Sequence, residues 1–559
     1  MSAGRSGAEI LAQQLDEHGV THFFMVPAVL RRTMMALELQ TSIARIHAHG
    51  EKAAAYMADG YARATGRPGV CGAQVVGALN LAAGLRDAWL AHSPVIALTG
   101  GRHPSTKFKN VYQEVDDVPA FEPVTKMNAT IDQADRIPDM VAQAFRSATT
   151  GRPGPVHLQF QGNEAQLDRE EVEVDARVDR RFASVPPFRP RPDEADVRAC
   201  LALFERSERP VIVAGGGVRA SGAGGELRRF AERMGIPVAT SLNGRECMPD
   251  THPLSVGVPG AYARSCANEV MRRADFVCFI GSSAGSMTTH SWTAPKPGVS
   301  AAQIDLEPSE IGRNYPLDAA IHADARAALE ALTALAHDVE RGRGEAWRNE
   351  VAAIKAGWRD RERAVMASDA VPIRPERLCA TLTQVVPDDA IVVVDTGHAG
   401  MWMAGYFDLN HTGQSFMRSC GHLGWAFPAG IGAKCGAPNR PVVVFTGDAG
   451  LWYHVAELET AVRWGVNLVV VVNNNGAGNQ SKRGFDRAYG GEPTARSREL
   501  WTYHPVDFAQ LASTIGAFAV RVTSPQHLSG AVEQALAAGR PALVDVVTDV
   551  EALAPVMEQ

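Results

Sequence analysis

The feature that most constrains the fold is a series of short, nearly continuous runs of branched apolar residues between longer helical patterns. Because these runs do not alternate apolar with polar residues, we expect them to be strands buried on both faces. Such strands separated by helices imply parallel sheets, so the sequence predicts an α/β fold built from doubly wound parallel sheets. Eight runs carry the pattern: Phe23–Val26, Val95–Leu98, Val156–Phe160, Val211–Ala214, Phe276–Ile280, Ile391–Val394, Val442–Phe445 and Leu468–Val472.

Two stretches resemble linkers and divide the chain into three units. Residues 177–196 are rich in proline and arginine. Residues 339–372 have a charged helical pattern followed by a proline-containing stretch. The length of 559 residues suits about three or four domains of about 100–200 residues each. We therefore predict units at 1–178, 195–338 and 368–559, with no visible internal repeat.

Composition excludes several classes of protein. The net charge is -7, with 55 basic and 62 acidic residues, which argues against nucleic-acid binding. No apolar stretch approaches the roughly 18 residues of a membrane span, and acidic residues interrupt the amino terminus before a signal sequence can develop. The eight cysteines lack metal-site spacing and are expected to be reduced thiols. We expect a cytoplasmic protein without membrane contact.

The motif with the most chemical content lies in the third unit. Asp448 follows one predicted strand, and Asn475 follows the next strand, 27 residues later. Adjacent parallel strands would bring both side chains to the carboxyl edge of the sheet, where open α/β folds bind ligands. A carboxylate, an amide oxygen and a nearby backbone carbonyl suit Mg²⁺, whose other ligands are often phosphates. The alternative is an aspartate that caps a helix beside an asparagine-rich turn.

This pattern resembles the signature of thiamine-diphosphate-dependent enzymes, in which GDG is followed about two dozen residues later by NN. Ala449 replaces the usual middle glycine here. The resemblance implies that Asp448, Asn475 and the Ala477 carbonyl bind the metal. It also places Gly447, Ala449 and Gly450 at the diphosphate.

Further segments resemble the same family in the same order. In the first unit, Glu51 matches the glutamate that shares a proton with N1′ of the cofactor; alone it would fit a first-turn helix acid. The loop GALN would place Gly77 and Asn80 at the cofactor, and Gln113 matches a glutamine near the substrate. In the third unit, the resemblance assigns diphosphate binding to Gly397, His398 and Ala399. It implies that Leu423 bends the cofactor and that the Gly421 carbonyl accepts a hydrogen bond from its 4′-amino group.

The order of the units resembles the branch that contains acetolactate synthase, oxalyl-CoA decarboxylase and 2-hydroxyacyl-CoA lyase. Residues 281–292, GSSAGSMTTHSW, lack the aspartates and arginine that acetolactate synthases carry there. We therefore expect FAD to be absent and the central unit to bind ADP or CoA. The glycines at 215–217 would suit a nucleotide or simply a tight strand-to-helix turn.

The segment 479–505 is unusually long and contains Glu499, Trp501 and Tyr503 where relatives place a substrate-covering loop. A carboxyl and two aromatic rings would suit a proton donor in an apolar cavity, with Glu499 as the acid. They would equally suit loop anchors that pack on the domain.

The resemblance implies an enzyme that makes or breaks a carbon–carbon bond on thiamine diphosphate. Our first interpretation is a 2-hydroxyacyl-CoA lyase that releases an aldehyde or ketone and formyl-CoA. The alternative is an acetolactate synthase-like decarboxylase or carboligase of 2-oxo acids. A catalytically silent cofactor-binding homologue is a third interpretation, and an NAD dehydrogenase lacks its glycine motif. Family members share sites between chains, which implies a homodimer or homotetramer with a small-molecule substrate.

Overall fold

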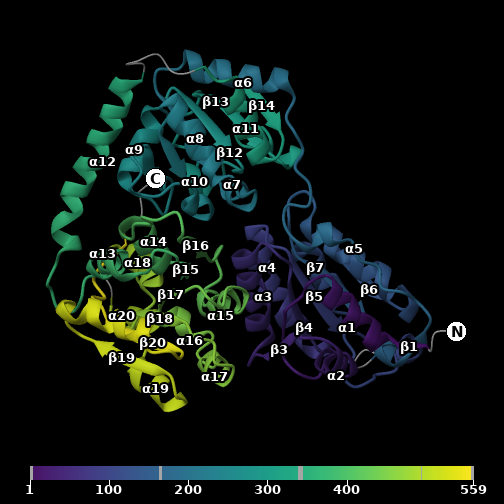
Figure 1. The fold of residues 1–559 in the computed structure, drawn as a ribbon. Coiled ribbons are helices and arrows are strands. Elements are labelled where there is room, and N and C mark those ends of the chain that lie inside the picture. The colour runs from purple at the N-terminus through teal and green to yellow at the C-terminus, as the bar shows by residue number, and fades with distance from the viewer. Residues whose placement is uncertain (1–3, 163–165, 338–343, 493, 555–559) are drawn as a thin grey trace.

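The computed structural model describes residues 4–162, 166–337, 344–492 and 494–554. Three six-stranded sheets, in which every pair of neighbouring strands is parallel, form three α/β units along the chain (Figure 1). This confirms the predicted fold class. The predicted unit end at residue 338 lies outside the described residues, and the exact boundaries remain predictions.

The first unit holds its sheet between helices that precede and follow each strand. A short antiparallel pair, β1 (Arg5–Ser6) and β8 (Glu171–Val172), joins its two ends. Its strands are β2 (His22–Met25), β3 (Ala44–His47), β4 (Gly69–Ala73), β5 (Val95–Gly100), β6 (Met127–Ile131) and β7 (Val156–Phe160). Its helices are α1 (Gly7–Glu17), α2 (Arg31–Gln40), α3 (Glu51–Thr65), α4 (Ala78–Ala91) and α5 (Ile137–Thr149).

The middle unit has shorter helices around its sheet. Its strands are β9 (Pro210–Ala214), β10 (Val238–Thr240), β11 (Ser255–Gly257), β12 (Phe276–Ile280), β13 (Ser300–Asp305) and β14 (Ala319–His322). Its helices are α6 (Glu194–Arg206), α7 (Gly216–Ala220), α8 (Gly224–Met234), α9 (Ser265–Arg273), α10 (Ser286–Thr289) and α11 (Ala325–Leu335).

The third unit follows α12 (Glu345–Met366), a long helix that runs along the outside from the middle unit to the third (Figure 1). Its strands are β15 (Ile391–Val394), β16 (Ser415–Arg418), β17 (Val442–Gly447), β18 (Val469–Asn474), β19 (Phe518–Val522) and β20 (Ala542–Val547). Its helices are α13 (Pro375–Val385), α14 (His398–Tyr406), α15 (Ala426–Gly436), α16 (Asp448–Trp452), α17 (Glu457–Arg463), α18 (Asn479–Ala488), α19 (Phe508–Ile515) and α20 (Leu528–Ala537).

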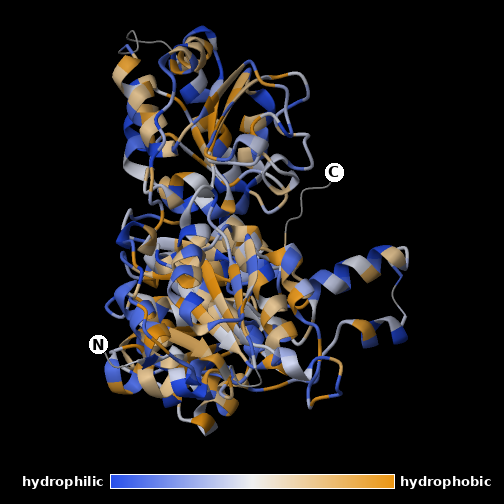
Figure 2. Ribbon diagram, turned by 90° about the vertical axis from the view of Figure 1, so that its right-hand side faces the viewer, coloured by the Kyte–Doolittle hydropathy of each residue, from blue (hydrophilic) through white to orange (hydrophobic). Residues whose placement is uncertain are grey.

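All eight predicted apolar runs overlap strands of these sheets, and the strands appear as hydrophobic ribbons inside each unit (Figure 2). Strands that the apolar pattern did not reveal include the half-buried edge strands β6 and β19 and the three-residue strand β10. Edge strands pack on fewer neighbours, so their sequences need less continuous apolar character. The pattern also missed interior strands, because glycines interrupt β4 and Asp545 interrupts β20. No helix of the described chain is long and apolar enough to cross a membrane.

The first and third sheets share one topology although no sequence repeat is visible. Their strand orders are β3-β2-β4-β5-β7-β6 and β16-β15-β17-β18-β20-β19. The middle sheet has the order β11-β10-β9-β12-β13-β14, which is the order typical of dinucleotide-binding folds. The strand order reverses between β9 and β12, and ligands of such folds bind at that point.

The first and third units share a continuous core through α3 and α15. A Cβ atom at Gly60 would lie 1.9 Å from the carbonyl oxygen of Ala429, and one at Gly432 would lie 1.8 Å from that of Met57. The two backbones are therefore in direct contact. At the same interface the Trp425 indole donates a hydrogen bond to Asp59 at 2.9 Å.

The middle and third units are joined by buried arginines. Arg245, which is 1% exposed, donates to the carbonyl oxygen of Met403 at 2.8 Å and to Asp250 at 3.1 Å. Arg264 bridges Asp250 at 2.9 Å and Asp408 at 2.6 Å. Such buried pairs need every partner, because removing one leaves an uncompensated charge.

We predict that Gly60→Ala destabilises the protein by at least about 1–3 kcal/mol, because the added methyl group would force α3 and α15 apart. Thermal unfolding followed by calorimetry measures the effect. Gly357→Ala in α12 is the control, since its Cβ would meet only Arg361, at 3.7 Å. That substitution should stabilise by about 0.5–1 kcal/mol. Equal stability of Gly60→Ala and the wild type would contradict the close helix contact.

Candidate active site

Asp448 and Asn475 lie together at the carboxyl edge of the third sheet. Asp448 begins α16 directly after β17, and Asn475 directly follows β18, the parallel neighbour of β17. The Ala477 amide donates to Asp448 Oδ2 at 2.9 Å and to Asn475 Oδ1 at 3.1 Å. The structure therefore brings together the three residues predicted to bind a metal.

The Asp448 carboxylate is buried, and burial raises its pKa to about 6. Hydrogen bonds from the amides of Ala449 and Ala477 lower the pKa but do not cancel this effect. A buried carboxylate of this kind favours a compensating cation. Within the described residues no group of three His, Cys, Asp or Glu side chains could hold a metal ion. The oxygens of Asp448, Asn475 and a backbone carbonyl are donors of the kind that Mg²⁺ prefers.

The residues assigned to the diphosphate lie next to this group. Gly397 has a φ of 69° and immediately precedes α14. It lies in the loop after β15, which is the other parallel neighbour of β17. His398 is 7% exposed, and neither ring nitrogen has a hydrogen-bond partner. Burial lowers its pKa to about 4, with a further lowering by Arg483. A buried ring at the amino end of α14 whose nitrogens lack hydrogen-bond partners fits a site that receives an anionic group.

A buried carboxylate ties the remaining third-unit loops together. Asp395 accepts hydrogen bonds from Thr446 Oγ1 at 2.9 Å and from the Gly424 amide at 3.1 Å. A Cβ at Gly450 would lie 2.7 Å from this carboxylate, so the glycine is required for the approach. Gly424 ends the loop that carries Gly421 and Leu423; Gly421 is exposed with a φ of 137°, and Leu423 is half-buried.

The first unit gathers its predicted residues at the carboxyl edge of its own sheet. Glu51 is the first residue of α3, and Asn80 Nδ2 donates to Glu51 Oε2 at 3.2 Å. A Cβ at Gly77 would lie 2.4 Å from Glu51 Oε1, so the carboxylate packs directly on this glycine. Gln113 has a φ of 62° and accepts a hydrogen bond from Gln74 at 2.9 Å. Gln74 lies in the same loop as Gly77.

The helix that begins with Glu51 contacts the third unit. Glu457 accepts a hydrogen bond from the His49 amide at 3.0 Å, two residues before Glu51. Lys52 Nζ lies 5.2 Å from the centre of the Tyr453 ring, close to the end of α16. The two groups of predicted residues thus lie on either side of one packed domain boundary.

The segment after β18 packs part of itself on the metal-binding loop. The Gly478 amide donates to the carbonyl of Trp501 at 2.7 Å, and the Tyr503 amide donates to that of Gly476 at 2.8 Å. Burial and the charge of Asp448 raise the pKa of Tyr503. Glu499 is not part of this group, because its side chain is 67% exposed and lies 3.9 Å from Arg496. The anchoring interpretation fits the buried Trp501 ring, whereas the Tyr503 side chain is 42% exposed, and a proton-donor role for Glu499 stays a prediction.

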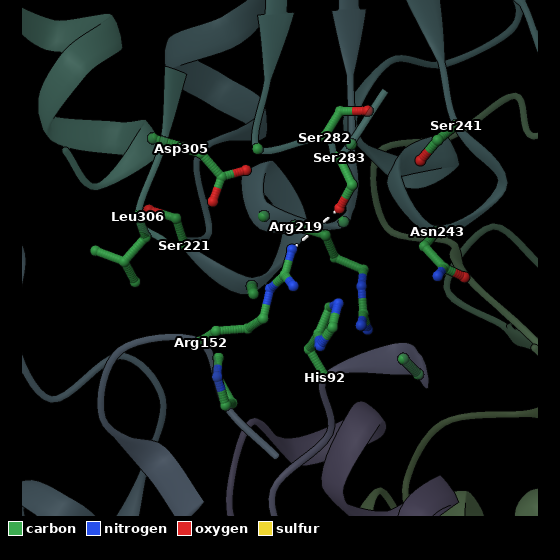
Figure 3. Close-up of a pocket in the computed structure, with 18 of the residues that line it drawn as sticks. His92, Arg152, Arg219, Ser221, Ser241, Asn243, Ser282, Ser283, Asp305 and Leu306 are labelled. Atoms are coloured by element: carbon green, nitrogen blue, oxygen red, sulfur yellow. Dashed lines mark hydrogen bonds between the residues drawn. The ribbon is translucent and has the colours of Figure 1, made fainter. Parts of the chain in front are cut away.

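A cavity of about 460 Å³ lies at the strand-order reversal of the middle sheet (Figure 3). Its lining includes Arg219, Ser282 and Asp305 from the middle unit. Arg152 reaches in from the first unit, donating to Ser283 Oγ at 3.0 Å. The lining also includes His92 from the first unit and Arg418 and Cys420 from the third.

The glycines at 215–217 serve both packing and this cavity. All three line it, and a Cβ at Gly215 would lie 2.1 Å from the carbonyl oxygen of Gly281. The glycine motif indicated this position. Nothing in the sequence around His92, Arg152 or Arg418 indicated their presence there, because only the packing of three units brings them to one cavity.

Three models of one family match the chain. Residues 5–120 match the thiamine pyrophosphate enzyme N-terminal TPP binding domain, residues 197–332 its central domain and residues 395–546 its C-terminal TPP binding domain. The matches follow the order of the three structural units.

Curated relatives align along nearly the whole chain. A probable acetolactate synthase large subunit of Methanocaldococcus jannaschii is 33% identical over 97% of this chain and 92% of its own length. A glyoxylate carboligase of Escherichia coli O157:H7 is 31% identical over 96% of this chain and 91% of its own. An acetolactate synthase large subunit of Lactococcus lactis is 29% identical over 97% and 92%.

Proposed function

Because the chain belongs to the thiamine pyrophosphate enzyme family, in its acetolactate synthase branch, we propose that it is a thiamine-diphosphate- and Mg²⁺-dependent decarboxylase or carboligase of 2-oxo acids. The observation that carries the proposal is the convergence of Asp448, Asn475 and Ala477 beside the partnerless, buried His398. An oxygen donor set suits Mg²⁺, and a buried imidazole with free nitrogens can hydrogen-bond a diphosphate oxygen.

The relatives change the order of our two substrate interpretations. We ranked a 2-hydroxyacyl-CoA lyase first, yet the named relatives are acetolactate synthases and a glyoxylate carboligase. They support the 2-oxo acid alternative, which we now place first. The lyase reaction remains an outcome of the substrate test below.

Each predicted residue has a defined task in this proposal. Thiamine diphosphate, when bound, supplies an acidic carbon that adds to a carbonyl group and stabilises the negative charge left by cleavage. Asp448, Asn475 and the Ala477 carbonyl would hold Mg²⁺. His398 and the amides at the starts of α14 and α16 would bind the diphosphate. Glu51, held by Asn80, would exchange a proton with N1′, while Gly421 and Leu423 would fix the bent shape and Gln113 would face the substrate.

We further propose a homodimer or homotetramer with sites shared between chains. Exposed apolar side chains flank the Glu51 group, which supports an interface there: Val76 and Leu79 border Gly77 and Asn80, and Phe108 and Tyr112 precede Gln113. Several exposed apolar side chains near one site are a feature that interaction surfaces share. In this proposal, residues from a second copy of the chain complete each active site.

The substitutions Asp448→Ala and Glu51→Gln should separate binding from activation. Asp448→Ala removes a metal ligand, so titration calorimetry should show thiamine diphosphate affinity lowered at least about tenfold. Glu51→Gln should bind the cofactor yet slow exchange of its C2 proton by about 10²–10⁴-fold. Asp388→Ala, which removes an aspartate that is 78% exposed, is the control. Cofactor binding unchanged and metal-independent in Asp448→Ala would contradict the metal site, and normal C2 exchange in Glu51→Gln would remove its role.

We propose that the central cavity binds an ADP-like nucleotide rather than FAD, with Arg152 and Arg219 at the phosphates and Asp305 at the ribose. Purified protein should be colourless, and ADP should raise the unfolding temperature of the wild type. Arg219→Ala should weaken ADP binding by about tenfold, as expected for loss of one charged hydrogen bond. A yellow protein with bound flavin would overturn this assignment and leave the thiamine site unaffected.

Substrate choice is tested by incubating the holoenzyme separately with pyruvate, glyoxylate and 2-hydroxyacyl-CoA esters. We expect release of CO₂ and a carboligation product from a 2-oxo acid, with Glu51→Gln at least about a hundredfold slower. Cleavage of the CoA esters without reaction of either 2-oxo acid would restore the lyase interpretation. Cofactor binding without any reaction would instead favour a silent homologue.

A further inference from the structure

Asp87, on α4 of the first unit, binds a loop of the third unit. Its carboxylate is 0% exposed and accepts hydrogen bonds from the Cys420 amide, at 2.9 Å to Oδ2 and 3.1 Å to Oδ1. Ser419 Oγ lies 3.0 Å from Oδ2 as a donor, and within the loop it also lies 2.8 Å from the His422 carbonyl and accepts from the Gly421 amide at 3.2 Å. His422 Nδ1 lies 3.5 Å from Oδ2, which is too far for a strong hydrogen bond.

This loop is the segment that carries Gly421 and Leu423. Strand β16 ends at Arg418, whose carbonyl accepts from Arg63 Nη1 at 2.7 Å, and the other end of the loop is held at Gly424 by Asp395. A Cβ at Gly421 would meet no atom within 4 Å. The loop is therefore fixed at both ends, and Gly421 between them faces open space.

The charges around Asp87 make these loop contacts necessary. Arg63 pairs with both Asp59, at 2.7 Å, and Asp87, at 2.8 Å, so one buried cation faces two buried carboxylates. Burial raises the pKa of Asp59. Burial acts on Asp87 in the same direction, but His422, Arg63 and the Cys420 amide outweigh it and lower the pKa of Asp87. The loop thus supplies part of the compensation that keeps Asp87 ionised.

We propose that Asp87 is a positioning residue, which sets the loop Ser419–Gly424 so that Gly421 and Leu423 take up the geometry that thiamine diphosphate needs. The inference rests on the proposed function, because it assigns the loop to that cofactor. It assigns to the first unit a second task besides carrying Glu51: it shapes the third unit's half of the site across the boundary within the chain.

The test compares Asp87→Asn with Asp59→Asn. Asp59 is equally buried and shares Arg63, but its other bond runs to the Trp425 indole and not to the loop amides. In the protein without cofactor, amide hydrogen exchange of the peptide 418–424 should be at least about tenfold faster in Asp87→Asn than in the wild type or Asp59→Asn. With cofactor, exchange of the C2 proton and kcat should fall about 10- to 100-fold, because small misplacements have effects of that size, while KM for the substrate stays within about twofold.

Ser419→Ala keeps the proposal testable if Asp87→Asn does not fold. It removes one donor to Asp87 together with the Ser419 contacts to His422 and Gly421 inside the loop, and it leaves the carboxylate and the Cys420 amide in place, so the same measurements should change about threefold in the same direction. The two substitutions combined should change loop exchange by less than the product of their separate effects, because they act on one contact.

The outcomes separate the inference from the proposed function. A wild type that does not bind thiamine diphosphate would overturn the proposed function and this role with it. If the wild type binds the cofactor, but Asp87→Asn or Ser419→Ala leaves both loop exchange and C2 exchange unchanged, only the role of Asp87 is overturned. Equal effects of Asp59→Asn and Asp87→Asn would likewise show a general packing defect instead of positioning.

Discussion

The contact between α3 and α15 is the constraint on which the rest of the structure depends. Gly60 and Gly432 allow the two helix backbones to touch, so the first and third units are held at van der Waals distance. Glu51 is the first residue of α3, and the loop with Gly421 and Leu423 leads directly into α15. Both groups of candidate residues in one chain are therefore attached to the same rigid helix pair. A shift in that pair would displace both.

Buried carboxylates complete this boundary from both sides. Asp87 of the first unit binds the amide of Cys420 in the third, and Glu457 of the third unit binds the amide of His49 in the first. Each unit thus satisfies backbone groups in the loop that leads to the other unit's functional residues. Orphaned amides at such positions would be costly, so the reciprocal arrangement explains how two irregular loops stay ordered at a domain boundary.

The sequence could predict the sheets and the metal-binding group because both follow from local rules. Continuous apolar runs marked the central strands, and the strand ends after β17 and β18 placed Asp448 beside Asn475. Edge strands such as β19 and the shared topology of two units were not visible, because topology depends on pairing and not on residue identity. The exposure of Glu499 depends on how the loop around it folds, which local pattern does not determine. The position of Glu51 came from the family resemblance, and its contacts with Gly77 and Asn80 needed the structure.

The cavity of about 460 Å³ has walls from all three units, including Arg152, Arg219 and Arg418. Any ligand that fills it interacts with the assembled chain and not with a separated unit, so its binding free energy adds to the free energy that holds the units together. Occupancy would turn three modules, which could open one after another on heating, into a single cooperative unfolding unit. The breadth of the thermal transition, as well as its midpoint, would then report whether this cavity is filled.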